Sequence, residues 1–191
     1  SKDSMNSKGQ ITVLGVGNIL FSDEGVGVRA IEALDAAYTF ADNVHLVDGG
    51  VLGLNLLATL ADADYLIVVD AVRNGGAPGT LYRFEGEQIP RRILAKNSLH
   101  QVDLLESLTL CQALDRVPET VILGVEPEDI ETLSLELTPA VKEQIEDLIH
   151  MVFTELDRLG AGYHPRQSSP DRQGAMENAP GAPHASCDQT E

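Results

Sequence analysis

The sequence predicts an α/β protein in which helices cover both faces of a mostly parallel, twisted β-sheet. Short β-branched runs alternate along the chain with segments of helical periodicity. The run Tyr65–Val69 is apolar throughout, as is typical of a central strand covered on both faces. Alternating strands and helices favour crossover connections that make neighbouring strands parallel. We therefore expect a doubly wound, three-layer αβα sandwich.

In the first half of the domain, strands and helices are expected to alternate over residues 11–16, 24–38, 44–47 and 52–60. The helix over 24–38 is expected because four apolar side chains recur on one helical face, namely Val28, Ile31, Leu34 and Tyr38.

In the second half, strands are expected over 65–69 and 120–125, with an edge strand over 81–84 after the turn-forming run NGGAPG. A helix is expected from about 101 to 114. A long helix is expected to begin at Thr138-Pro139, because Thr is a good N-cap and Pro suits the first helical position.

The composition changes sharply after Gly160. Residues 161–191 contain no Val, Ile, Leu or Phe and hold four of the nine prolines. Such a segment buries too little apolar surface to offset its ordering entropy. We therefore expect a polar N-terminal segment over 1–10, one domain over 11–160 and a disordered tail over 161–191.

The charge and hydropathy exclude several classes of protein. With 13 basic and 30 acidic side chains the formal net charge is −17, which disfavours binding to nucleic acid. The apolar runs are far shorter than the ~20 residues of a membrane-spanning helix. The polar start of the chain does not resemble a signal peptide, and its two cysteines form no recognisable disulfide or zinc motif. We expect a cytoplasmic protein with reduced thiols, acting as a monomer.

Four candidate functional residues are predicted to lie at the carboxyl ends of the strands, where α/β sheets bind their ligands. Glu24 follows the first strand, Asp48 ends the second, Asp70 ends the buried strand, and His100 begins a predicted helix. Two carboxylates and an imidazole suit a divalent metal such as Ni²⁺, Zn²⁺ or Mn²⁺. The sequence therefore predicts a metal-binding cleft, without specifying the metal or the substrate.

Each of these residues also has a purely structural interpretation. Glu24, like Asp23 beside it, can complement a helix N-terminus. Asp48 can bond its own backbone in a turn, and His100 can be a capping or surface residue. Asp70 favours a functional role, because a carboxylate after five apolar residues is costly to bury without a partner or a metal.

Other sites are disfavoured by their spacing. The start Gly15-Val16-Gly17 lacks the third glycine of a dinucleotide-binding loop, since Leu20 stands in that place. Neither a phosphate-binding GxxxxGK[ST] loop nor a GxSxG nucleophile motif is present. Cys111 is expected to be a buried, inert thiol among apolar neighbours.

Seven short segments occur in the following order: LGVGN at 14–18, DEG at 23–25, GVR at 27–29, DGG at 48–50, DA at 70–71, HQ at 100–101 and GVEPE at 124–128. In these segments the chain resembles the hydrogenase maturation endopeptidases, which process the large subunit of [NiFe]-hydrogenases. The resemblance covers about residues 11–160 and looks closest to the uptake-hydrogenase branch. The chain departs from the family at Val51, where relatives often have Thr, and in its long polar tail.

The resemblance implies a sandwich of the phosphorylase/hydrolase-like type and an endopeptidase of the aspartic type. It assigns Glu24, Asp70 and His100 to the family's metal-contacting positions and Asp48 to its functionally sensitive DGG segment. It further implies that nickel arrives with the large-subunit precursor, whose C-terminal extension is then removed. Two alternatives stay open from the residues alone, namely a non-catalytic nickel-binding assembly chaperone and, less favoured, a nucleotide-binding oxidoreductase.

Overall fold

The fold is built on a five-stranded sheet. The computed structural model describes residues 8–50, 56–86, 88 and 117–167. The strands lie in the order β3-β1-β4-β6-β5, and the first four are parallel while β5 runs antiparallel to β6. Their bounds are Ile11–Gly15 for β1, Val44–Asp48 for β3, Tyr65–Ala71 for β4, Leu81–Glu85 for β5 and Glu119–Val125 for β6. The predicted mostly parallel sheet and the edge position of β5 are confirmed.

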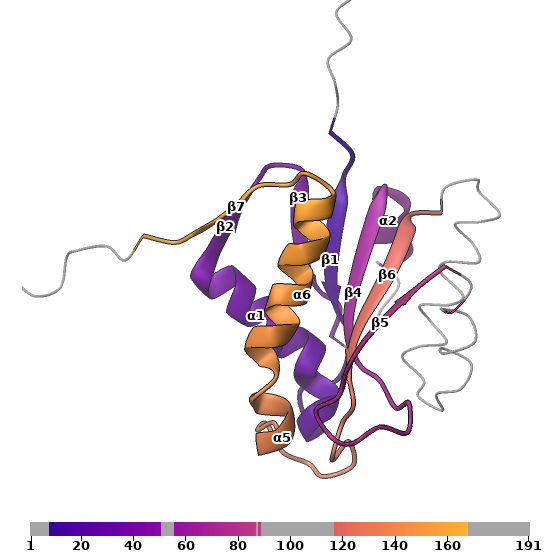
Figure 1. The fold of residues 1–191 in the computed structure, drawn as a ribbon, viewed down its shortest axis with the longest axis vertical. Coiled ribbons are helices and arrows are strands. Elements are labelled where there is room, and N and C mark those ends of the chain that lie inside the picture. Colours follow the sequence, from indigo (N-terminus) through magenta and orange to yellow (C-terminus); the bar gives the residue numbers. More distant parts are fainter. Residues whose placement is uncertain (1–7, 51–55, 87, 89–116, 168–191) are drawn as a thin grey trace, which may run out of the picture.

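Helices α1 and α6 cover one face of the sheet, and α2 lies on the other (Figure 1). The helical elements are the 3-10 turn η1 over Ser22–Gly25, α1 over Val26–Ala37, α2 over Leu56–Ala61, α5 over Pro139–Lys142 and α6 over Ile145–Arg158. Strand β4 contributes side chains to the hydrophobic core on both faces of the sheet, because successive side chains of a strand point to opposite faces. Ile67 and Val69 pack with α1 and α6, whereas Leu66 and Val68 pack with Leu60 of α2.

Two helix predictions need correction within the described residues. The long helix expected from Thr138 begins as predicted, with Thr138 at the N-cap position and Pro139 at the first helical position. It is divided into α5 and α6, however, and the Thr138 hydroxyl donates to Asp23 instead of to the helix backbone. The first long helix ends at Ala37, and Tyr38 begins a strand. The helix predicted over 101–114 and the start of the one predicted over 52–60 lie outside the described residues.

The expected disordered tail is wrong for its first residues. Strand β7, over Tyr163–Pro165, pairs antiparallel with β2, over Tyr38–Phe40. Ala161 is buried, and Tyr163 stacks on Phe153 at a ring-centroid distance of 4.2 Å. Aromatic contacts and main-chain pairing thus anchor a segment that lacks aliphatic side chains. The remainder of the predicted tail, residues 168–191, lies outside the described residues.

Truncation tests the corrected domain boundary. We expect a chain ending at Gly160 to lose about 2 kcal/mol or more of unfolding free energy, because it loses the Tyr163–Phe153 stack and the β2–β7 pairing. A chain ending at Gln167 keeps both and is the matched control. Thermal and denaturant unfolding measure the difference, and equal stability of the two chains would contradict the structural role of β7.

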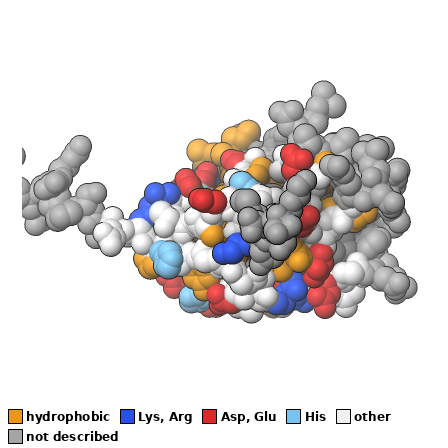
Figure 2. All heavy atoms as spheres, turned by 90° about the horizontal axis from the view of Figure 1, so that it is seen from above, with side chains coloured by type: hydrophobic (Ala, Val, Ile, Leu, Met, Phe, Trp, Pro, Cys, Tyr) orange, Lys and Arg blue, Asp and Glu red, His pale blue; other side chains and the backbone are white. Residues whose placement is uncertain are grey.

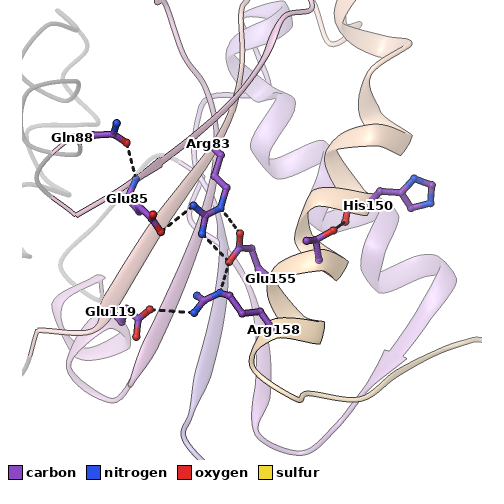
Figure 3. Close-up of polar contacts among 8 residues, drawn as sticks. Arg83, Glu85, Gln88, Glu119, His150, Glu155 and Arg158 are labelled. Atoms are coloured by element: carbon purple, nitrogen blue, oxygen red, sulfur yellow. Dashed lines mark hydrogen bonds and ion pairs between the residues drawn. The ribbon is translucent and has the colours of Figure 1, made fainter.

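An ion-pair network around the buried Glu155 fastens α6 to the sheet (Figure 3). Glu155 of α6 is 3% exposed and accepts hydrogen bonds from Arg83 Nε at 2.5 Å and from Arg158 Nε at 3.2 Å. Arg83 lies on β5 and also pairs with Glu85, while Arg158 reaches Glu119 at the start of β6. Burial opposes ionisation of Glu155, but the two guanidinium groups outweigh it and lower the pKa of this carboxyl.

The lowered pKa of Glu155 predicts a pH-dependent contribution to stability. A carboxyl whose pKa is lower in the folded state stabilises the fold above its ordinary pKa of 4.5, and this contribution declines as the pH falls further. We expect Glu155→Gln to cost about 1 kcal/mol or more at pH 7, because two partly exposed arginines lose the charge of their shared acceptor. The difference from the wild type is expected to shrink below pH 4.5 in denaturant titrations.

Glu119→Gln is the control for this titration, because it removes an exposed partner of Arg158. Exposed pairs of this kind contribute less than about 1 kcal/mol. A difference between Glu155→Gln and wild type that does not change with pH would show that the charge of Glu155 is not what stabilises the fold.

The face of the molecule shown in Figure 2 carries both acidic and basic side chains. Viewed from the end at which β1 begins, acidic and basic side chains lie intermixed over the described part of the molecule (Figure 2). Among the described residues, no helix is both long and apolar enough to cross a membrane.

Candidate active site

The candidate site lies where the parallel strands end, at the bottom of Figure 1. The strand register brings the predicted residues to this edge. Gly15 is paired with Asp48 of β3 on one side and with Val69 of β4 on the other, and Asp70 is paired with Gly124 of β6. Asp48 and the end of β4 are therefore separated by two strand spacings, roughly 10 Å.

Asp70 is a buried carboxylate inside the sheet. Its strand continues to Ala71, so that Asp70 lies within β4 and not beyond it, and the residue is 8% exposed. Strand alternation places it on the same face as Leu66 and Val68, which is the face covered by α2. Among the predicted residues that the structure describes, Asp70 is the most deeply buried.

Glu24 is brought to this edge by two close backbone approaches. Gly17 has a φ of 125°, and a Cβ at this position would overlap with the carbonyl oxygen of Glu24. A Cβ on Gly27 would overlap with the carbonyl oxygen of Val69, one residue before Asp70. Only glycine permits both approaches. They press η1 and the start of α1 against the ends of β1 and β4, and Glu24 is half-buried there.

Asp48 forms the turn that its two following glycines predict. Its Oδ1 accepts a hydrogen bond from the backbone N–H of Gly50 at 2.8 Å, and Gly50 has a φ of 30°. The side chain is exposed to solvent. Strand alternation places Asp48 on the α1 face together with Gly15, opposite to the face on which Asp70 lies. Turn formation and a role in catalysis are compatible, because one carboxylate has several acceptor positions.

The structure describes only two of the three predicted metal ligands, Glu24 and Asp70. His100 lies outside the described residues, and within those that are described no three His, Cys, Asp or Glu side chains form a group able to hold a metal ion. Glu24 and Asp70 share one edge of the sheet, but the Glu24, Asp70 and His100 set stays a prediction.

Asp23 is the residue whose importance the sequence did not reveal. It is fully buried, and its carboxylate accepts four hydrogen bonds of 2.8–3.0 Å. The donors are the backbone N–H groups of Glu128, Asp129 and Thr138 and the hydroxyl of Thr138. The predicted role of Asp23 at a helix start is therefore secondary. Its main role is to fasten η1, which carries Glu24, to the loop that follows β6.

Glu126 holds the loop that follows Asp70. This side chain is 7% exposed, and its two oxygens accept the N–H groups of Asn74 at 2.7 Å and Gly75 at 3.2 Å. Burial, followed by the neighbouring charge of Glu126, raises the pKa of Tyr82. The GVEPE segment was noted in the sequence, but its pairing with a turn 51 residues away follows only from the tertiary structure.

Comparison with known proteins identifies a family for this chain. The family model described as hydrogenase maturation protease matches residues 28–155. The hydrogenase 2 maturation protease of Escherichia coli K12 is 39% identical over 164 residues, which cover 85% of this chain and 99% of the relative. The hydrogenase expression/formation protein HupD of Thiocapsa roseopersicina is 39% identical over 96% of this chain and 81% of its own length.

Solved structures agree with the sequence comparisons. The hydrogenase maturating endopeptidase HybD from Escherichia coli superposes with a TM-score of 0.78 at 39% identity, over 82% of this chain and 98% of HybD. The [NiFe] hydrogenase maturation protease HybD from Thermococcus kodakarensis gives a TM-score of 0.63 at 24% identity, which shows the shared fold. The chain belongs to the hydrogenase maturation protease family. It is an endopeptidase with an α/β fold.

Substitution of Asp23 tests its role in building the site. Asp23→Asn replaces an acceptor oxygen with an amide that cannot accept, so that at least one buried donor loses its partner. We expect a loss of about 2 kcal/mol or more in unfolding free energy. In hydrogen exchange, we expect faster exchange at the amides of Glu128, Asp129 and Thr138. Asp42→Asn, at an exposed turn, is the control, and unchanged protection of those amides would contradict the assignment.

Proposed function

We propose that this endopeptidase removes the C-terminal extension of a [NiFe]-hydrogenase large-subunit precursor after nickel has been inserted. Membership of the hydrogenase maturation protease family supports the reaction, and the names of the Escherichia coli relatives support the class of substrate. The observation that carries the site is the buried carboxylate of Asp70 at the carboxyl edge of the sheet.

In this proposal Glu24, Asp70 and His100 contact the nickel of the precursor. The metal is part of the substrate and is not stored by the enzyme. Two carboxylates and one imidazole leave coordination positions open on a divalent ion, so the precursor's own ligands complete the shell. This arrangement makes cleavage conditional on nickel insertion, because a precursor without the metal lacks the group that these residues recognise.

Asp48 is proposed as the general base. Hydrolysis adds water across the scissile peptide bond, with the hydroxide oxygen bonding to the carbonyl carbon and the amine leaving with a proton. The nickel ion supplies polarisation of the carbonyl or of the attacking water. The exposed carboxylate of Asp48 accepts the water proton and returns it to the leaving amine. Water is the nucleophile and an aspartate is its base, which is the sense in which the enzyme is proposed to be of the aspartic type.

The proposal places the protein in the cytoplasm as a monomer that meets its substrate there. The absence of a membrane-spanning helix among the described residues is consistent with this location. A stable complex with the processed large subunit is not expected, because cleavage lets that subunit close around its metal centre.

The proposed ligands are tested with purified nickel-loaded and nickel-free precursor. We expect Glu24→Gln, Asp70→Asn and His100→Ala each to lower the cleavage rate at least about 100-fold, because each removes a donor and leaves core volume nearly unchanged. Mass spectrometry of the precursor measures cleavage, and circular dichroism checks the fold. Asp62→Asn, an exposed carboxylate at the end of α2, is the matched control.

The same assay separates the roles. Asp48→Asn is expected to lower kcat more than it weakens binding of the precursor, as for a group that acts in the transition state. Binding of the nickel-loaded precursor without shortening would instead support the assembly-chaperone alternative. Full processing by all three ligand variants, or equal cleavage of precursor with and without nickel, would overturn the proposed site.

A further inference from the structure

Three exposed leucines lie beside the element that carries Glu24. The exposed fractions are 48% for Leu20, 74% for Leu133 and 58% for Leu135. Most other large aliphatic side chains of the described residues are in the core, and Val117 at 52% is a further exposed one. We call Leu20, Leu133 and Leu135 the leucine surface. Exposed apolar side chains that gather at one place mark binding sites more often than scattered ones do.

Backbone pairing brings these leucines together across more than a hundred residues of sequence. Phe21 and Ser134 form an isolated parallel bridge. In it, Ser134 N–H donates to the Leu20 carbonyl at 2.9 Å, and Ser22 N–H donates to the Ser134 carbonyl at 2.8 Å. The register of this bridge places Leu20 opposite Leu133, and Leu135 directly follows the bridged Ser134.

The leucine surface is held rigidly. The Arg29 guanidinium donates to the Leu135 carbonyl at 3.0 Å, and the Ser22 hydroxyl donates to the Glu136 carbonyl at 2.9 Å. The buried Asp23 carboxylate fastens both ends of the 128–138 loop. The leucines are therefore presented to solvent by a well-bonded scaffold, which lowers the entropic cost of binding a partner.

The charge around the leucine surface specifies its partner. Residues 126–136 contain five acidic side chains and neither Lys nor Arg, and of the five only Glu126 is buried. The nearby Arg29 is already paired with Glu32. Glu128, Glu131 and Glu136 are exposed. An apolar surface within an acidic loop is complementary to a peptide segment that combines apolar and basic side chains. The negative electrostatic potential of these acidic side chains also attracts a basic segment before contact.

We propose that the leucine surface is the docking site for an apolar, basic segment of the hydrogenase large-subunit precursor. This inference rests on the proposed function. Leu20 is four residues from Glu24, and Phe21 O accepts the Glu24 N–H at 3.1 Å. A segment bound on the leucines therefore lies next to the carboxylate edge of the sheet. The enzyme then recognises its substrate twice, through the metal and through this surface.

The test compares Leu133→Ser/Leu135→Ser with Val117→Ser, using the full chain and nickel-loaded, full-length precursor. Val117 is equally apolar and exposed but precedes β6, at the opposite end of the sheet. We expect the double variant to raise KM about tenfold or more with kcat nearly unchanged, because the leucines bind substrate without touching the reacting bond. Val117→Ser is expected to retain wild-type KM and kcat.

A second double variant tests the contribution of the acidic side chains around the leucine surface to precursor binding. Glu131→Gln/Glu136→Gln is expected to weaken precursor binding at low salt and to reduce the loss of affinity that added salt causes in the wild type. Binding is measured directly by biolayer interferometry, so that docking and cleavage are scored independently. Circular dichroism and melting temperature confirm that the variants are folded.

The outcomes separate the two proposals. Precursor that binds the wild type through the leucines but is never cleaved overturns the proposed function and keeps the docking site. If the Leu133→Ser/Leu135→Ser variant is active with the wild-type KM and affinity, the proposed docking site is wrong and the proposed function stands. Sedimentation showing a wild-type dimer that the double variant dissociates also overturns it, because a second copy then covers the surface.

Discussion

The buried carboxylate of Asp23 is the interaction on which the candidate active site depends. It joins η1, which follows the first strand, to a loop more than a hundred residues later, by satisfying four donors with one side chain. A buried charge is stable only when it is hydrogen-bonded in this way, and four charge-assisted bonds meet that need. The position of Glu24 and the presentation of the leucine surface both follow from this connection.

The site is also shaped by backbone contacts that exclude side chains. Gly17 and Gly27 let η1 and α1 approach the ends of β1 and β4 more closely than any other residue permits. Glu126 fixes the turn after Asp70 from the neighbouring strand. The carboxylates of the edge therefore have different roles: Asp23 and Glu126 hold the scaffold together. The proposed chemistry is assigned to Glu24, Asp48 and Asp70.

Membership of the hydrogenase maturation protease family gives this arrangement a biological context. In the proposed function, each precursor is cleaved once, after its metal centre has been filled. Weak ligation by three residues suits that task, since a site that bound nickel tightly by itself would respond to the free metal instead of the loaded precursor. Recognition of a peptide segment by the leucine surface adds specificity without tightening the metal site.

The sequence by itself determined the strands of the sheet, its mostly parallel order and the edge position of β5, because apolar periodicity and turn chemistry are local. It also determined the family and the carboxylates at the strand ends. Only the tertiary structure decided which acids are structural. Asp23 and Glu24 are adjacent in sequence, yet their roles differ because partners from 128–138 reach Asp23. The pairing of β2 with β7 was equally hidden, since Tyr163 finds Phe153 and Tyr38 only when distant segments meet.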